Sequence, residues 1–99
     1  MTRVHFNLVA RPEQRDELLA ALDRLELAAA ADDAFLIEVE LHIPLDNPDR
    51  VLIVSTWPSP EHYTRWRQGA GWDRIYDAIE PLLAEEPDVH VYRLVDAIG

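Results

Sequence analysis

The sequence contains no cysteine. Disulfide bonds, thiolate metal ligands and a cysteine nucleophile are therefore excluded. The sequence also lacks any apolar run near the roughly 20 residues that cross a bilayer, so we expect no membrane-spanning helix. The first residues, MTRVHFNLVARPEQ, reach a proline and an acid before an apolar stretch of about 7–15 residues can form. We expect no secretory signal and a cytoplasmic location.

Basic residues are few and lysine is missing. Nine arginines stand against 19 acids, which gives a formal net charge of −10. Such a field repels phosphate backbones and anionic lipids, so neither nucleic acid nor a membrane surface is an expected partner. The 99 residues, 48% of them hydrophobic, suffice for one modest core. We expect a single domain over residues 1–99.

The first 32 residues predict a strand and a helix. Side chains alternate in character over residues 3–10, as in a strand. Pro12 stands at a favoured first helical position, and the acids after it suit the positive end of a helix dipole. We expect a helix from Pro12 into the AAAADD segment. Its apolar stripe consists of Leu18, Leu22, Leu25 and Ala29.

The middle of the chain predicts a β-hairpin. Residues 34–43 return to period two, with Phe35, Ile37, Val39, Leu41 and Ile43 on one face. Residues 44–50 contain the Pro, Asn and Asp of a connecting turn. Residues 51–57, VLIVSTW, form the apolar run of a central strand.

The last third predicts helical segments and a final strand. Ser59 can cap a helix that begins at Pro60 and runs to Gly69, where the GAG sequence breaks it. A further amphipathic segment covers residues 72–83, and Pro81 tightens or ends its last turn. Residues 88–97 close the chain as a strand.

This βαββαβ order predicts a ferredoxin-like α+β sandwich with a four-stranded antiparallel sheet in the order 4-1-3-2. Both sheet faces are predicted to be apolar, because Val9 opposes the face of Val4 and residues 51–54 have no polar side chain. An uncovered apolar face would form a large exposed patch. We therefore expect a homodimer built sheet to sheet.

An aromatic cluster lies in residues 55–69, STWPSPEHYTRWRQG. Tyr63 and Trp66 are three residues apart on one helix and project to the same side, and His62 reaches Trp66 at four-residue spacing. Trp57, at the end of the preceding strand, can lie under them. Large aromatic side chains usually fill a core. The histidine and arginines among these rings favour a pocket instead, so both interpretations stay open.

This pattern resembles the antibiotic biosynthesis monooxygenase family of dimeric α/β barrels, over nearly the whole chain. The shared motif is a strand ending in Trp-x-Ser, followed by a helix in which an aromatic residue precedes a Trp by three positions. Here these are Trp57-Pro58-Ser59 and Tyr63-Thr64-Arg65-Trp66. The resemblance implies the same element order and pairing through the sheets.

One branch of that family oxidises anthrones, quinols and related aromatics without flavin, haem or metal. The resemblance therefore implies a cofactor-independent monooxygenase whose partners are a small aromatic substrate and O2. It implies site residues at Trp57 and Tyr63, and a polar site residue near Tyr76. Some members carry an Asn where this chain has Ile53, so an oxyanion contact from that position is not expected here.

Without a redox cofactor the substrate itself must supply electrons, which requires removal of a proton inside an apolar box. His62 is the candidate base, because histidine titrates near neutral pH, although it could instead face solvent early in its helix. Tyr63 and Tyr76 could donate hydrogen bonds to a phenolic oxygen. Trp57 and Trp66 would stack on a flat ligand and keep water away.

Asn7 shares a strand face with His5. If that face looks toward the helices, Asn7 would line the same cavity and could orient oxygen or a substrate carbonyl. A second branch of the family degrades haem with an Asn on the first strand, a Trp on the second helix and a later His. Asn7 and Trp66 match, whereas Ile75 and Tyr76 occupy the region of that His.

Two alternatives to the cofactor-free oxygenase thus remain. One is a haem-binding or haem-degrading monooxygenase, with Tyr76 as the candidate axial ligand. The other is a non-catalytic ligand-binding dimer of the same fold. No metal site is expected, because the predicted strand order separates His42 from His5 and His90.

Overall fold

The computed structural model describes residues 1–32 and 36–95, with side chains for residues 1–23 and 36–95. The elements are β1 (Thr2–Val9), α1 (Arg15–Asp32), β2 (Glu38–His42), β3 (Arg50–Trp57), α2 (Pro60–Arg67), α3 (Ala70–Ile79), the short 3₁₀ helix η1 (Glu80–Leu82) and β4 (Asp88–Arg93). This order confirms the predicted ferredoxin-like α+β fold.

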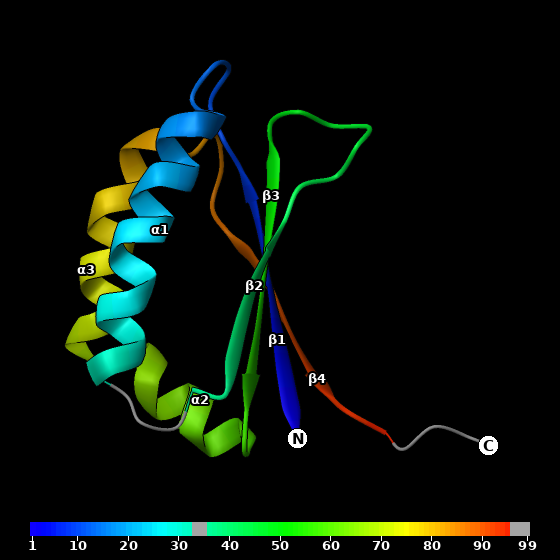
Figure 1. Cartoon of the computed structure of the whole chain (residues 1–99), viewed down its shortest axis with the longest axis vertical. Helices are drawn as coiled ribbons and strands as arrows, with labels where there is room; N and C mark the ends of the chain where they lie inside the picture. The colour runs from blue at the N-terminus through cyan, green and yellow to red at the C-terminus, as the bar shows by residue number, and fades with distance from the viewer. Residues whose placement is uncertain (33–35, 96–99) are drawn as a thin grey trace.

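The four strands form one antiparallel sheet in the order β2-β3-β1-β4. This is the predicted order, read from the opposite edge. Helices α1 and α3 pack side by side on one face of the sheet and leave the other face open (Figure 1). In the register of the central strands, Phe6 lies opposite Ile53 on β3 and Val89 on β4.

The core lies between the sheet and the helices. Strand β1 buries Val4, Phe6 and Leu8 toward the helices, because alternate residues of a strand point to the same face. Each such side chain contributes roughly 1.5–3 kcal/mol when fully buried. The helices contribute the buried residues Leu18, Ala21, Leu22, Trp72, Ile75 and Ile79.

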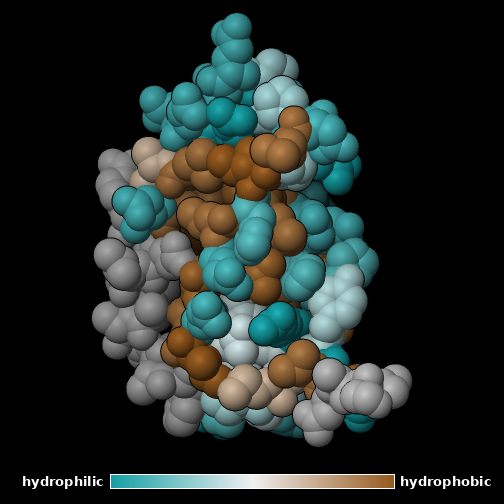
Figure 2. Space-filling view, turned by 45° about the vertical axis from the view of Figure 1, so that its right-hand side comes forward, coloured by the Kyte–Doolittle hydropathy of each residue, from teal (hydrophilic) through white to brown (hydrophobic). Residues whose placement is uncertain are grey.

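The open face of the sheet is mostly polar, which corrects the prediction that both faces are apolar. His5 and Asn7 alternate with the core residues of β1, and the register places Glu40 and His90 in the same layer. The apolar side chains of this face are those of Val9, Leu52 and Val54 and the exposed ring of Tyr92. Figure 2 shows this side of the molecule obliquely, with hydrophilic and hydrophobic residues interspersed. The composition of this face therefore does not by itself call for a partner.

Helix α1 begins at Arg15 and not at Pro12. The Gln14 N–H donates a 2.9 Å hydrogen bond to the Arg11 carbonyl, and Glu13 has a φ of 67°. Proline at the second position and a positive φ at the third are features of a type II turn, so Pro12 builds a turn ahead of the helix. Leu18 and Leu22 are buried as predicted. The side chains of Leu25 and Ala29 lie outside the described residues.

Two strands are shorter than predicted. Strand β2 covers Glu38–His42, although the Ile37 N–H still donates a 2.9 Å hydrogen bond to the Thr56 carbonyl. Ala34 and Phe35, assigned to this strand from the sequence, lie outside the described residues. Strand β4 ends at Arg93, after which the Leu94 N–H bonds the Met1 carbonyl at 2.9 Å. Residues 96 and 97 of the predicted strand also lie outside the described residues.

The α2–α3 junction brings the aromatic residues of both helices together. The Ser59 side chain caps α2 by accepting a hydrogen bond from the His62 N–H, as predicted. Helix α3 begins at Ala70 and includes Gly71, which corrects the predicted start at residue 72. Gly69 lies at a tight position between the helices, since a Cβ there would approach the Trp66 carbonyl oxygen to 3.3 Å. Pro81 stands in η1, which tightens the end of the segment.

Candidate functional site

A cavity of about 50 Å³ lies between the sheet and the helices. Its sheet side is lined by Phe6, Val39, Leu41, Ile53, Ser55 and Trp57. Its helix side is lined by Leu22, Trp66, Trp72 and Ile75, and Leu36 completes the lining. The polar groups of these side chains are the Ser55 hydroxyl and the indole N–H groups. The cavity is therefore an almost wholly apolar box.

The size of the cavity limits what it can hold. One water molecule needs about 10–15 Å³ of such space, so the cavity as it stands holds a few waters. Pockets for drug-sized ligands are typically about 300–1,000 Å³. A fused polycyclic ligand would require the lining residues to move apart, whereas a single ring requires much less rearrangement.

Three indole rings form one wall of the cavity. The ring centroids of Trp57 and Trp66 are 5.3 Å apart, and those of Trp66 and Trp72 are 5.7 Å apart. Trp57 lies on the helix side because it shares strand parity with Ile53 and is only 1% exposed. Aromatic pairs at such distances contribute about 0.5–1.5 kcal/mol beyond area burial. The wall is thus well ordered by its own packing.

Ser55 is held in this wall by a hydrogen bond. Trp57 Nε1 donates to Ser55 Oγ at 2.9 Å, and both residues are buried. The two are neighbours on one strand face, since they are two positions apart on β3. Sequence analysis did not identify Ser55 as a site residue. In the sequence, Ser55 could have been recognised as a hydroxyl-bearing residue that interrupts the apolar run of β3 two positions before Trp57.

The indole N–H of Trp66 has no acceptor. Its Nε1 atom is buried and makes no hydrogen bond with any described residue. Gly71 lies beside it, since a Cβ at position 71 would be 3.5 Å from Nε1. A buried donor left unpaired costs about 1–3 kcal/mol, so this indole N–H lowers the stability of the fold.

Tyr63 lies behind the wall and does not line the cavity. Its ring contacts those of Trp57 and Phe6, with centroids 5.9 Å and 6.1 Å away. Its Oη accepts a 2.8 Å hydrogen bond from Arg67 Nη1. The Arg67 guanidinium also lies 4.5 Å from the centroid of Trp72, in a cation–π arrangement. Arg67 is a second residue that sequence analysis did not assign to the site.

Tyr76 lies on the outer side of α3. It lines a broad, open hollow of about 510 Å³ together with Arg67, Trp72, Pro87 and three acids, Asp73, Asp77 and Glu86. Trp72 borders both this hollow and the cavity, and its ring centroid is 5.8 Å from that of Tyr76. Tyr76 therefore contacts the wall from outside and does not reach the cavity.

His62 lies at the start of α2 and does not line the cavity. Its Nδ1 atom is 2.6 Å from Ser59 Oγ, the hydroxyl that caps the helix. The neighbouring Glu61 carboxyl has a pKa below its ordinary value of 4.5. The main cause is a hydrogen bond from its own backbone N–H, followed by one from Ser59 and the nearby charge of His62. Ser59, Glu61 and His62 are therefore parts of the N-terminal cap of α2.

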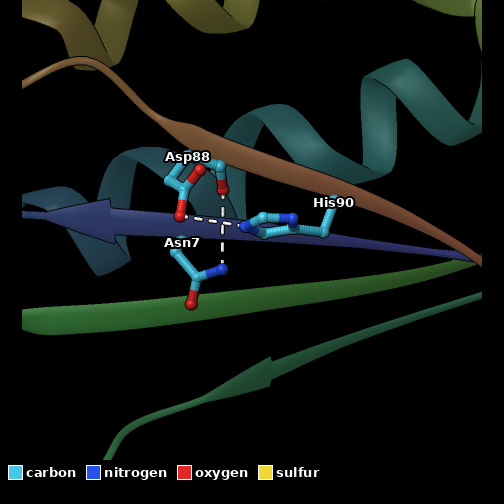
Figure 3. Close-up of polar contacts among 3 residues, drawn as sticks. All are labelled: Asn7, Asp88 and His90. Atoms are coloured by element: carbon cyan, nitrogen blue, oxygen red, sulfur yellow. Dashed lines mark hydrogen bonds and ion pairs between the residues drawn. The ribbon is translucent and has the colours of Figure 1, made fainter.

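Asn7 lies on the open face of the sheet. Its Nδ2 donates a 3.5 Å hydrogen bond to the Asp88 carbonyl, and His90 Nε2 lies 3.0 Å from Asp88 Oδ2 (Figure 3). Asn7 could line the cavity only if its face of β1 were turned toward the helices. Phe6 occupies that side of β1 instead. The structure therefore brings Trp57, Tyr63 and Trp66 together and leaves Asn7, His62 and Tyr76 outside.

No histidine, aspartate or glutamate lines the cavity among the residues whose side chains are described. Among the residues with described side chains, no group of three or more His, Cys, Asp or Glu could hold a metal ion. None of the helices in the described ranges is long and apolar enough to span a membrane.

The family model described as antibiotic biosynthesis monooxygenase matches residues 1–78. All the cavity-lining residues fall within this range. A comparison with curated protein sequences finds no match.

Solved structures resemble the chain over nearly its whole length. A proposed antibiotic biosynthesis monooxygenase from Bordetella bronchiseptica has a TM-score of 0.86 at 19% identity, covering 95% of this chain and 96% of that one. A second, from Caulobacter crescentus, has a TM-score of 0.86 at 14% identity, with 96% and 90% covered. A third, from Nitrosomonas europaea, has a TM-score of 0.83 at 10% identity, with 96% and 99% covered. At these identities the similarity shows a common fold.

Proposed function

The chain belongs to the antibiotic biosynthesis monooxygenase family, and from this premise we propose that it oxidises a small, electron-rich aromatic substrate with O2. The observation that carries the proposal is the cavity between sheet and helices, which has an indole wall and a single buried hydroxyl. The proposed substrate is a phenol or quinol, and the proposed reaction uses no redox cofactor.

In this reaction the substrate supplies all the electrons that reduce dioxygen. One oxygen atom is inserted at a ring carbon, and the other leaves as water with the two hydrogens lost as the quinol becomes a hydroxyquinone. The apolar lining supports this chemistry because it excludes water from the deprotonated ring. The indole faces of Trp57 and Trp66 offer a surface on which a flat ring can stack.

The described residues of the cavity wall offer no base for the proton of the substrate. His62 is the residue expected to serve as base, but it bonds Ser59 and does not line the cavity. We propose that the substrate enters as the phenolate, or loses its proton to water at the cavity mouth. The rate should then follow the ionisation of the substrate and not that of a histidine.

Oxygen consumption by the purified protein tests the proposal. A panel of hydroquinone, methylhydroquinone and anthrone is used in metal-free buffer with a chelator, and autoxidation is subtracted. The variant Val39→Phe fills the cavity, while Glu40→Gln is its control on the open face of the same strand. Wild type and Glu40→Gln should consume oxygen, and Val39→Phe should lose most of this activity. No uptake by wild type above autoxidation, or full uptake by folded Val39→Phe, would contradict the proposal.

We also propose that the chain pairs with a second copy through its sheet, as its resemblance to dimeric family members implies. Exposed apolar side chains at the end of β4 and just beyond it support this pairing. Tyr92 and Leu94 are each 49% exposed, and Val95 is 66% exposed. Analytical ultracentrifugation should give twice the chain mass, and a monomer at all concentrations would contradict the pairing.

The haem alternative gains no support from the site. Of the two residues that indicated it, Asn7 lies on the open face of the sheet, whereas Trp66 of α2 lines the cavity on the other side. Tyr76, the candidate axial ligand, lies in the outer hollow. A titration with haem should therefore give no saturable Soret shift.

A further inference from the structure

The open face of the sheet carries three of the four histidines of the chain. His5 lies on β1, His42 on the edge strand β2 and His90 on the other edge strand, β4. The register arranges this face in rows that cross all four strands. In the order β2, β3, β1, β4, the middle row consists of Glu40, Val54, His5 and His90, and the next row consists of His42, Leu52, Asn7 and Asp88. Each edge of the sheet therefore carries one carboxylate and one imidazole in these two rows.

The two edge pairs stand in opposite order. On β2 the carboxylate lies in the middle row and the imidazole in the next, with Glu40 Oε2 3.7 Å from His42 Nε2. On β4 the imidazole lies in the middle row and the carboxylate in the next, with Asp88 Oδ2 3.0 Å from His90 Nε2 (Figure 3). The four side chains are between 49% and 70% exposed. They are therefore accessible to a partner that lies on this face.

We infer that this partner is a second copy of the chain whose two-fold axis runs along the strands, an inference that rests on the proposed pairing of two copies through the sheet. Such an axis lays each row on its own copy and exchanges the two edges, so that β2 faces β4 of the second copy. Glu40 then faces His90 of the second copy, and His42 faces Asp88 of the second copy. Carboxylates and imidazoles alternate around the resulting group of four.

The other aligned arrangement of two copies lacks this match. Sheets in aligned packing keep their strand directions within about 30° of each other. A two-fold axis across the strands would also align them, but it lays β2 on β2 and β4 on β4 of the second copy. Glu38 and Glu40 would then stand against the same two acids, and like charges in contact destabilise an interface. The order of charges at the two edges therefore selects the axis along the strands.

The open face is also less acidic than the rest of the chain. Two chains of net charge −10 repel each other, so a contact between them needs local attraction. The third row of this face consists of Glu38, Thr56, Arg3 and Tyr92. Together the three rows contain only three of the 19 acids of the chain, and Arg3 and the three histidines offset them. Two copies can thus approach through this face with little of the general repulsion.

Charge reversal at the two edges tests this arrangement. In Glu40→Lys a cation would face His90 of the second copy, and in His90→Glu a carboxylate would face Glu40 of the second copy. Each single variant should raise the Kd of the dimer by about tenfold or more, since the unfavourable contact occurs twice across a two-fold axis. Analytical ultracentrifugation measures this Kd at about pH 6, where an ordinary histidine is mostly protonated. Asp23→Lys is the control, because Asp23 is exposed on α1 away from the open face, and it should not weaken the dimer.

The double variant Glu40→Lys/His90→Glu gives the decisive result. The introduced lysine would face the introduced glutamate of the second copy, so the double variant should recover a Kd close to that of wild type. Positions 40 and 90 lie on opposite edges of one sheet, so recovery cannot come from a contact within one chain. An axis across the strands predicts the opposite, because like charges would then meet at both edges.

Four results would overturn the inference. A dimer that neither single variant weakens, a double variant that fails to recover, or an equal weakening by Asp23→Lys would do so and leave the pairing through the sheet standing. A wild type that is monomeric at all concentrations would contradict the pairing and, with it, this inference. None of these measurements involves oxygen consumption, so the proposed oxidation is tested separately.

Discussion

Arg67 Nη1 donates a 2.8 Å hydrogen bond to Tyr63 Oη, one turn earlier on α2. The same guanidinium stacks on Trp72 of α3, so Arg67 joins the two helices that carry the indole wall. The wall therefore depends on a half-buried cation as well as on apolar packing. This contact leaves the Tyr63 hydroxyl proton free to donate elsewhere.

A double-mutant cycle of Arg67→Met and Tyr63→Phe should show a coupling of about 1 kcal/mol, since a hydrogen bond with a charged partner is partly screened at a half-buried position. Urea unfolding monitored by tryptophan fluorescence measures it. Arg65→Met is the control, because Arg65 is exposed on the same helix, and it should change the free energy of unfolding by less than about 0.5 kcal/mol. Additive effects of the two cycle mutations would show that the contact contributes nothing.

Replacement of Ser55 by alanine should lower the free energy of unfolding by about 1–3 kcal/mol. The change leaves the buried Trp57 Nε1–H without an acceptor, and its desolvation is then uncompensated. Ser55→Thr keeps the hydroxyl and should restore much of the loss if its methyl group fits the cavity. A Ser55→Ala protein as stable as wild type would mean that water or a shift of the indole satisfies the donor.

The fold followed from the sequence because its signals are local and strong. The period-two pattern of Val4, Phe6 and Leu8 and the Ser59-Pro60 cap each specify an element without long-range information. The start of α1 could not be predicted from the sequence, because Pro12 is equally suited to a first helical turn and to the second position of a type II turn. Only the hydrogen bond from Gln14 to Arg11 and the positive φ of Glu13 distinguish the two.

The site followed from the sequence only in part. Trp57, Tyr63 and Trp66 could be placed together because strand end and helix spacing bring them to one side. Asn7 could not be placed, because alternation assigns residues to two faces without saying which one the helices cover. The partner of Trp57 at Ser55 and the contact of Arg67 with Trp72 depend on side-chain rotamers and on the α2–α3 junction, which the pattern does not encode.

Glu61 should make the stability of the protein depend on pH in the acid range. Its pKa is lowered in the folded state from 4.5, so its ionised form favours folding. The contribution is fully present above pH 4.5, the value for the unfolded chain, and disappears as the pH falls through the lower folded value. Glu61→Gln should therefore be less stable than wild type at pH 7, and the difference should vanish at strongly acid pH. Thermal unfolding of both proteins across this range measures it, and a gap that persists in acid would show another cause.

Replacement of His62 by glutamine should leave the oxidation rate within about threefold of wild type, because His62 bonds the Ser59 cap and lies outside the cavity. A general base would contribute about 10²–10⁴ to the rate, so the two roles are easily separated. The pH–rate profile gives the sharper test. With phenols of graded acidity, the midpoint of the profile should move with the pKa of each substrate and should be the same in wild type and His62→Gln. A midpoint near neutral pH that is shared by all substrates and lost in the variant would show that His62 takes the proton after all, and that the cavity opens toward α2 when substrate binds.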